Sequence, residues 1–198
     1  TMSDSWNEHA DGWDANPAVK HYADQAFASL DARLGITAAG WASGRVLDFG
    51  CGTGLLAGKI APHVHEVIAV DSSDRMIAVL KDKGIRNITA VHGDILDHDF
   101  PLDPRAFADF DLVYASSVCS FLPDYPNAVA ALARMLRPGG DFVQWDWLAS
   151  GSDGFGLSEA EIRRALGAAQ LHDIRVEPAF EIEAEGAALP VLIGTGTR

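Results

Sequence analysis

The chain has 198 residues, which fits one domain better than two. Its 48% hydrophobic and 22% charged residues are typical of a globular protein, and no apolar run approaches the roughly 18–20 residues that cross a bilayer. The formal net charge of −13, with no cluster of more than two basic residues, disfavours nucleic acids and anionic membrane surfaces as partners.

The N-terminal residues 1–16 are polar and acidic, so we expect no secretory signal there. Cys51 and Cys119 form no CxxC pair and lie near no plausible set of histidines. We therefore expect two free thiols, no metal site and a cytoplasmic location.

The apolar pattern alternates between strands and helices along the chain. This order predicts an α/β fold, with a parallel sheet and helices on both faces. Gly186 separates the last two strands, which predicts an antiparallel C-terminal hairpin. The predicted helices cover about 16–34, 53–61, 74–83, 125–136 and 158–169, and the predicted strands cover 45–49, 66–70, 87–91, 110–115, 141–147, 174–184 and 189–195.

Turn and cap residues set the expected limits of these elements. Pro62 and Gly84 should end two helices, and Ser158 with Glu161 should form a capping box that starts the last one. A glycine- and serine-rich loop is expected over 149–157. We expect one domain over 1–198, with an N-terminal helical segment over 1–40 and the core over 45–198.

Three glycines, Gly50, Gly52 and Gly54, lie between the first predicted strand and its helix. Glycine allows a tight turn and lets a ligand approach the backbone, and amides at a helix start favour negative groups. A purely structural turn is one alternative. A dinucleotide site is another, but it needs G-x-G-x-x-G, and Asp48 would repel a pyrophosphate while it attracts an ammonium group.

The run Asp48-Phe49-Gly50-Cys51-Gly52-Thr53-Gly54 resembles the signature loop of class I S-adenosylmethionine-dependent methyltransferases, in their small-molecule (type 11/12-like) group. The resemblance implies a Rossmann-like, seven-stranded, mostly parallel sheet. It also implies that Asp48 orders the loop and the methionine end of the cofactor, and that the backbone of the loop approaches the cofactor. The implied loop contacts are Gly50, Cys51, Gly52, Thr53 and Gly54.

Asp71 ends the second predicted strand, where a carboxylate can accept hydrogen bonds from both hydroxyls of a ribose. Nicotinamide enzymes use the same arrangement, so Asp71 alone does not choose between the two cofactors. The alternative is that Asp71 caps the next helix, in competition with Ser72 and Ser73. The resemblance adds Ser72 to the cofactor site and places Met76 against the adenine.

Gly93, Asp94 and Ile95 follow the third predicted strand directly. Alone, a Gly-Asp pair would indicate a turn. The resemblance implies that Asp94 accepts a hydrogen bond from the adenine amino group and that Ile95 packs on the ring. A dinucleotide enzyme has less need of this acid.

The fourth predicted strand runs into Ser116 and Ser117, which the resemblance places near the methionine amino group and sulfur. Many relatives have a histidine in the stretch that follows, where this chain has Cys119 and Ser120. Cys119 is most simply a buried packing residue. Residues 137–140 match the turn before the fifth strand of the family.

The N-terminal segment carries Trp6, Trp13, Asp14 and Tyr22, which resemble the lead segment of small-molecule methyltransferases. The resemblance implies a lid over the cofactor, with Trp13 and Tyr22 in contact with it. The alternative is a surface helix whose aromatic side chains pack on the sheet. In the fifth predicted strand, Trp145 or Trp147 lines a substrate pocket or packs in the core.

The resemblance implies a methyltransferase that moves a methyl group from S-adenosylmethionine to an O, N, S or C atom of a small molecule, with S-adenosylhomocysteine as the product. Such a transfer needs a base only when the nucleophile is protonated. We find no strong catalytic motif; His9, His21 and Asp146 are candidate bases, but a role as a surface polar residue or at a helix terminus explains each of them better. The alternatives are an NAD(P)-dependent reductase and a non-catalytic binding module.

Overall fold

The computed structural model describes residues 2–149, 155–184 and 186–198. Residues 150–154 of the predicted glycine- and serine-rich loop lie outside the described residues. The chain divides into two compact units, residues 1–102 and 103–198. The single domain over 1–198 stays a prediction. In the described part of the chain, no helix is both long and apolar enough to cross a membrane.

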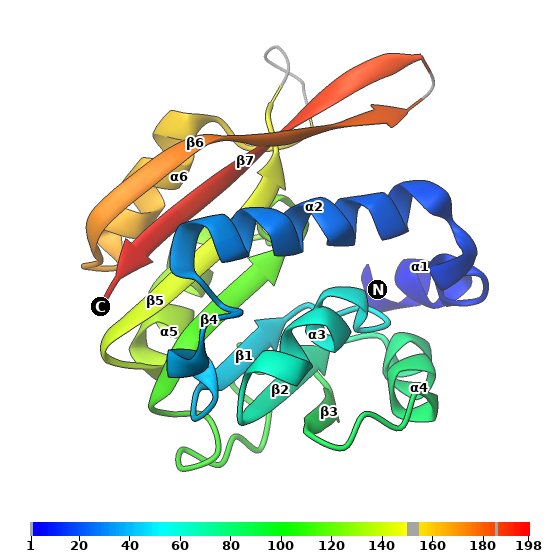
Figure 1. The fold of residues 1–198 in the computed structure, drawn as a ribbon, viewed down its shortest axis with the longest axis horizontal. Coiled ribbons are helices and arrows are strands. Elements are labelled where there is room, and N and C mark those ends of the chain that lie inside the picture. The colour runs from blue at the N-terminus through cyan, green and yellow to red at the C-terminus, as the bar shows by residue number, and fades with distance from the viewer. Residues whose placement is uncertain (1, 150–154, 185) are drawn as a thin grey trace. The chain divides into compact units, whose positions relative to one another are not determined.

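The first unit contains three parallel strands in the order β3-β2-β1 (Figure 1). Valine and isoleucine dominate the central strand β2, which suits a strand buried on both faces. The elements are α1 (Met2–Ala10), η1 (Trp13–Ala15), α2 (Pro17–Leu34), η2 (Ala39–Trp41), β1 (Arg45–Phe49), α3 (Leu55–Ile60), η3 (Ala61–His63), β2 (Glu66–Asp71), α4 (Asp74–Asp82) and β3 (Ile88–His92), where η marks a short 3-10 helix.

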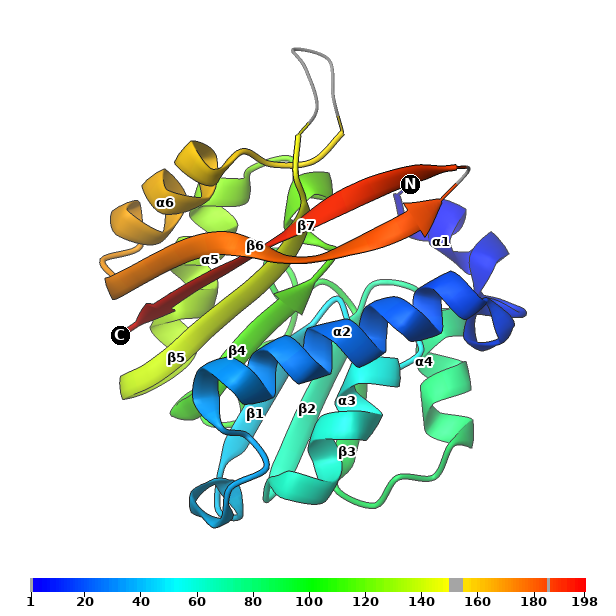
Figure 2. The ribbon, with the colours of Figure 1, turned by 45° about the horizontal axis from the view of Figure 1, so that its top comes forward.

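The second unit contains β4 and β5 in parallel and the antiparallel pair β7 and β6, with β7 between β5 and β6 (Figure 2). Its elements are β4 (Phe110–Ser116), η4 (Cys119–Phe121), α5 (Tyr125–Met135), β5 (Leu136–Trp147), α6 (Glu159–Ala168), β6 (His172–Ala184) and β7 (Ala187–Thr197). The strand order of the seven-stranded sheet is β3-β2-β1-β4-β5-β7-β6. The predicted fold class, a mostly parallel Rossmann-like sheet with an antiparallel C-terminal pair, is confirmed.

Helix α3 is shorter than the helix predicted over 53–61. Gly54 has a φ of +77°, in the left-handed region, so the regular helix starts after it. Pro62 was expected to end this helix, but α3 ends at Ile60 and is followed directly by η3, which contains Pro62. It lies in the first turn of η3, where its missing N–H leaves no helical hydrogen bond unmade.

The predicted turn over 137–140 lies inside β5 as a bulge rather than before it. Leu136 pairs with Phe110, and Asp141 pairs with Leu112, so five steps along β5 match two along β4. Backbone hydrogen bonds to Arg198 at the end of the chain hold this bulge, at 2.7 Å from the Gly139 N–H and 2.9 Å to the Gly140 carbonyl.

The predicted capping box at the start of α6 is confirmed. The Ser158 side chain accepts from the Glu161 N–H, and the Glu161 carboxylate accepts from the Ser158 N–H at 2.8 Å. Two backbone donors that would otherwise lack partners are satisfied in this way.

We predict that Gly140→Ala lowers the free energy of unfolding by about 1–3 kcal/mol, because a Cβ there would lie 2.7 Å from the Phe110 carbonyl oxygen. Gly40→Ala is the matched control, since a Cβ at Gly40 meets nothing within 4 Å. Urea unfolding of both variants measures the effect, and equal stabilities would contradict the prediction.

Candidate functional site

The first unit gathers most of the predicted cofactor residues at one edge of its sheet. Strands β1, β2 and β3 are parallel, so their carboxyl ends meet at the same edge. Ligands of open α/β sheets bind at such an edge. Asp48, Asp71 and Asp94 lie in or just after the three strand ends, together with the glycine loop over 50–54.

The glycine loop is folded onto the end of β2 by three successive amides. Gly50 and Cys51 donate their N–H groups to the Val70 carbonyl at 2.8 and 2.9 Å, and Gly52 donates to Asp71 Oδ2 at 2.8 Å. The loop is therefore a hydrogen-bonded turn at the end of the second strand.

All three glycines of the loop have a positive φ, at +73° for Gly50, +54° for Gly52 and +77° for Gly54. Their surroundings differ. A Cβ at Gly52 would meet no atom within 4 Å, whereas a Cβ at Gly54 would lie 2.3 Å from Cδ1 of Leu80. Gly54 thus allows α3 and α4 to pack closely, and Gly52 leaves open space beside the backbone.

Asp71 lies half-buried at the junction of β2 and the loop. Its Oδ2 accepts from Gly52 and its Oδ1 from the Ser73 N–H, both at 2.8 Å. Burial raises the pKa of Asp71, and the amide hydrogen bonds oppose this shift. Each carboxylate oxygen keeps a lone pair for a further donor.

The alternative role of Asp71 as a helix cap is wrong. Ser73 is the cap of α4, and its hydroxyl accepts from the Met76 N–H at 3.1 Å. Ser73 is fully buried, so the capping hydroxyl faces the interior, and Asp71 remains available at the edge of the sheet.

Asp48 is 2% exposed and Cys51 is half-buried. Burial, then the charges of Asp48 and Asp71, raises the pKa of the Cys51 thiol well above its usual value. The thiol is therefore neutral at physiological pH and is unsuited to act as a nucleophile.

The residues predicted to surround an adenine differ in their exposure to solvent. Asp94 is exposed, and its Oδ1 accepts from the Leu96 N–H at 2.9 Å, while Ile95 is buried. Gly93 has a φ of +141°, and its N–H donates to the Asp71 carbonyl at 2.9 Å. These contacts fix the turn after β3 against the end of β2.

Two residues complete the predicted set on the α4 side. Met76 is 2% exposed, in the first turns of α4. Ser72 is exposed, and its carbonyl lies 3.2 Å from His92 Nε2. Their contacts with a cofactor stay predictions.

A polar cluster joins the N-terminal segment, here α1 and η1, to the glycine loop. The Asp14 carboxylate accepts a hydrogen bond from the Thr53 hydroxyl and forms an ion pair with Lys83 Nζ at 2.6 Å. Lys83 also donates to the Thr53 carbonyl at 2.7 Å. Thr53 is only 1% exposed, and these contacts anchor the loop. Its contact with a cofactor stays a prediction.

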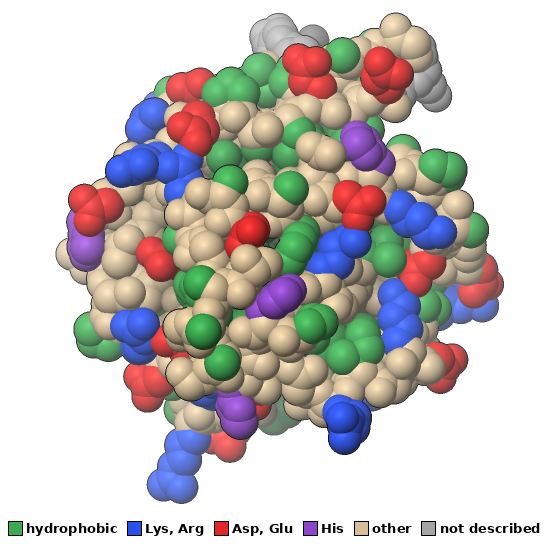
Figure 3. All heavy atoms as spheres, viewed as in Figure 1, with side chains coloured by type: hydrophobic (Ala, Val, Ile, Leu, Met, Phe, Trp, Pro, Cys, Tyr) green, Lys and Arg blue, Asp and Glu red, His purple; other side chains and the backbone are tan. Residues whose placement is uncertain are grey.

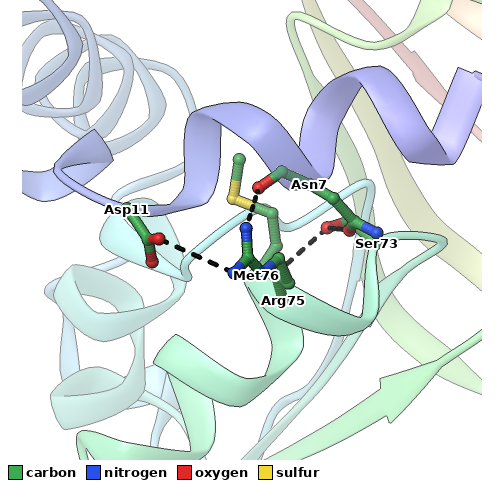
Figure 4. A network of polar contacts seen from close by, with 5 residues as sticks. All are labelled: Asn7, Asp11, Ser73, Arg75 and Met76. Carbon is green, nitrogen blue, oxygen red and sulfur yellow. Dashed lines mark hydrogen bonds and ion pairs between the residues drawn. The ribbon is translucent and has the colours of Figure 1, made fainter.

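A second cluster joins α1 to the start of α4 (Figure 4). The Ser73 hydroxyl bonds to the Asn7 side chain, and Arg75 donates to the Asn7 carbonyl at 3.4 Å. Arg75 also lies 3.8 Å from the Asp11 carboxylate. In Figure 4, Met76 lies beside these contacts, with α1 across them.

The aromatic side chains of the N-terminal segment pack on one another. The rings of Trp6 and Trp13 meet edge to face with centroids 6.0 Å apart, and His9 lies beside both. Trp13 remains half-buried and Tyr22 of α2 is 9% exposed. The proposed contacts of Trp13 and Tyr22 with a cofactor stay predictions.

In the second unit, Ser116 is half-buried at the end of β4. Ser117 has a φ of +58°, and its hydroxyl accepts from Trp147 Nε1 at 3.0 Å. Trp145 is fully buried and belongs to the core, whereas Trp147 is half-buried. Of the two tryptophans, only Trp147 presents surface to a substrate.

Asp146 does not suit the role of a base. It is fully buried, so it has no surface for a substrate. Cys119 is also fully buried, which confirms its interpretation as a packing residue. The part of the site that sequence reasoning missed is the pair of polar clusters. Asn7 and Lys83 carry no local signal, since both are of types common on protein surfaces.

Charge is mixed over the face drawn in Figure 3. Lys and Arg side chains stand there in small groups between acidic side chains and histidines. The absence of a nucleic-acid partner stays a prediction from the net charge.

Comparison with known proteins gives a consistent result. Residues 46–140 match the protein family described as a methyltransferase domain. The chain is 34% identical over 98 residues to trans-aconitate 2-methyltransferase of Deinococcus radiodurans. The aligned region covers 48% of this chain and 35% of that protein. It is 31% identical over 138 residues to a ubiquinone biosynthesis O-methyltransferase of Alkalilimnicola ehrlichii, which covers 66% of this chain and 48% of that protein.

The chain thus spans less than half the length of these two relatives. Among solved structures, the N-methyltransferase NodS from Bradyrhizobium japonicum, in complex with S-adenosylhomocysteine, is similar with a TM-score of 0.65 and 20% sequence identity. The similarity covers 92% of this chain and 88% of NodS. At this identity it establishes the fold.

We predict that Gly54→Ala lowers the free energy of unfolding by at least about 2 kcal/mol, from left-handed strain and the clash with Leu80. Gly52→Ala should cost only the strain, about 1–2 kcal/mol, because its surroundings are open. Calorimetric unfolding of the two variants tests this difference, and a larger loss for Gly52→Ala would refute it.

Proposed function

We propose that this chain, which belongs to the class I S-adenosylmethionine-dependent methyltransferases, transfers a methyl group from S-adenosylmethionine to a small molecule. The relatives named for trans-aconitate and for ubiquinone biosynthesis support a small-molecule acceptor. The acceptor atom would be O, N, S or C.

The observation that carries the proposal is the Asp71 carboxylate at the junction of β2 and the glycine loop. Two amides orient it, and its remaining lone pairs suit the two hydroxyls of a ribose. Beside it, Gly52 offers backbone with nothing within 4 Å of a Cβ position. This cradle fits S-adenosylmethionine, whereas three carboxylates (Asp48, Asp71 and Asp94) disfavour the pyrophosphate of a dinucleotide.

When bound, S-adenosylmethionine supplies a methyl group already activated on a sulfonium sulfur. The chain's own residues would bind and orient it. The buried Asp48 carboxylate favours the cationic methionine end, while Asp94, Ile95 and Met76 would hold the adenine. Ser116 would lie near the methionine amino group. No base is assigned, since alignment and exclusion of water suffice for a nucleophile that is deprotonated at neutral pH.

We also propose a cytoplasmic location. Cys51 and Cys119 are both free thiols, as is usual in a reducing compartment.

We predict that Asp71→Ala weakens binding of S-adenosylmethionine by about 1–3 kcal/mol, or about 5- to 150-fold in Kd, the scale for hydrogen bonds to a charged acceptor. Asp74→Ala is the control, since Asp74 is an exposed carboxylate at the start of α4. Titration calorimetry with S-adenosylmethionine, and with NADH in parallel, measures both variants. Unchanged affinity in folded Asp71→Ala would remove Asp71 from the site, and tighter binding of NADH by the wild type would favour a reductase.

We predict that residues 5–22 close over the bound cofactor as a lid. Their amides should exchange hydrogen quickly in the free protein and slow markedly when S-adenosylhomocysteine is added, because a filled site gives Trp6 and Trp13 more apolar surface to cover. The Asp14 and Asn7 contacts would form the closed state. Amides of α6 serve as the internal control. Equal protection of 5–22 in both states would exclude a lid.

A further inference from the structure

A buried chain of hydrogen bonds crosses the second unit from α5 to η4. Gln144 and Asp146 lie two residues apart on β5, so they share a face of the sheet, and both are fully buried. The Tyr125 hydroxyl donates to Gln144 Oε1 at 2.7 Å, and Gln144 Nε2 donates to Asp146 Oδ2 at 2.9 Å. The Ser120 N–H donates to Asp146 Oδ1 at 3.0 Å.

The hydrogen bonds fix how the groups of this network are oriented. The Tyr125 hydroxyl occupies the acceptor of Gln144, so the amide N–H₂ faces Asp146, which accepts at both oxygens. The Cys119 thiol also hydrogen bonds to Asp146. The Asp146 carboxylate is thereby hydrogen-bonded to two adjacent residues of η4, Cys119 and Ser120.

Burial of a carboxylate is costly unless its acceptors are used. Burial raises the pKa of Asp146 to about 7, against the hydrogen bonds from Ser120, Gln144 and Cys119. The groups around the chain are Cys119 of η4 and Tyr125 of α5, with Glu161 of α6 acting on Tyr125; burial raises the pKa of both Cys119 and Tyr125. All of these groups are neutral or negative, so among the described residues named here none is a cation that would offset the charge of Asp146.

The turn that Asp146 holds presents an aromatic pair. Phe121 ends η4, and its ring lies against that of Phe155 with centroids 4.9 Å apart at 51°. Phe155 is 52% exposed, and Leu148, at the end of β5, is 36% exposed. Phe121 on the turn after β4 and Phe155 in the segment before α6 together offer an apolar binding surface.

We propose that Asp146 is a positioning residue that sets the η4 turn and, through Phe121 and Phe155, the binding surface for a methyl acceptor with a planar apolar ring. The inference rests on the proposed methyl transfer for the identity of the ligand as an acceptor. The hold of Asp146 on the turn is independent of it.

The variants separate positioning from simple packing. In Asp146→Asn the amide oxygen still accepts from the Ser120 N–H. The new NH₂ group can pair with the Gln144 oxygen once the Gln144 amide rotates. The turn should therefore stay in place, although the side chain at 146 no longer titrates. Asp146→Ala removes the hold on the turn. Tyr125→Phe breaks only the far end of the chain. Asp141→Asn is the control, because Asp141 lies on the same strand but bonds Thr197 instead.

The probe is 2-naphthol, a planar ring with a hydroxyl, measured by saturation-transfer NMR with S-adenosylhomocysteine present. We expect Phe121→Ala and Asp146→Ala to weaken it at least 10-fold, Tyr125→Phe to weaken it less, and Asp146→Asn and Asp141→Asn to leave it within 2-fold. Wild-type protein that does not bind 2-naphthol, or unchanged affinity in Asp146→Ala, overturns the proposal. Should Asp146→Ala not fold, unchanged affinity in Tyr125→Phe overturns it.

The pH profile supplies a readout that packing alone would not move. Protonated Asp146 keeps one acceptor for the Ser120 N–H, as the amide in Asp146→Asn does, so the affinity of the wild type for 2-naphthol should stay within 2-fold across pH 7. The ¹⁵N shift of the Ser120 amide in the free wild-type protein should instead titrate with a midpoint of about 7, and it should not titrate in Asp146→Asn. A Ser120 shift that does not change with pH in the wild type overturns the role of Asp146.

These measurements also keep the two proposals apart. Affinity for S-adenosylhomocysteine alone should be equal in all variants, because its predicted ligands lie mainly in the first unit. If the wild type binds no S-adenosylhomocysteine, methyl transfer fails, yet the Ser120 titration still reports the hold of Asp146. If Asp146→Ala weakens both ligands equally, the positioning role is wrong.

Discussion

The hydrogen bond from the Gly52 N–H to the Asp71 carboxylate is the contact on which the predicted cofactor site depends. A loop with three glycines in left-handed conformations has little preference of its own for one shape. The Val70 carbonyl and Asp71 supply that shape by taking three successive amides. In the proposed cofactor site the same carboxylate would also bind the ligand, so loop geometry and ligand affinity would both depend on one side chain.

At the junction of β2 and α4, different residues cap the helix and face the edge of the sheet. Ser73 caps α4 from a buried position, which leaves Asp71 at the edge of the sheet. The Ser73 hydroxyl also bonds to Asn7, and the Thr53 hydroxyl bonds to Asp14, so the loops after β1 and β2 are each tied to the N-terminal segment by the hydroxyl of a buried residue. Hydroxyls suit this task because each can donate to one partner and accept from another.

The sequence predicted the fold well because its signals are local. Apolar periodicity placed all seven strands, and Ser158 with Glu161 marked the start of α6. The predicted ends of helices and strands were wrong where contacts or backbone conformation that the local pattern does not show determine them. The bulge over 137–140 depends on Arg198, and the start of α3 depends on the conformation of Gly54. The site was predictable in its glycines and strand-end acids, but Asn7 and Lys83 join it only through the fold.

The close approach of α3 and α4 at Gly54 has a consequence for how this protein can change over time. Leu80 occupies the space that any larger residue at position 54 would need, so the two positions are epistatic. A smaller residue at 80 would have to appear first, and it would leave a cavity until position 54 filled it. The left-handed backbone adds a second barrier that no partner can remove. Sequence drift in this protein should therefore reach Leu80 more readily than Gly54, and a change at Gly54 should be accompanied by one at Leu80.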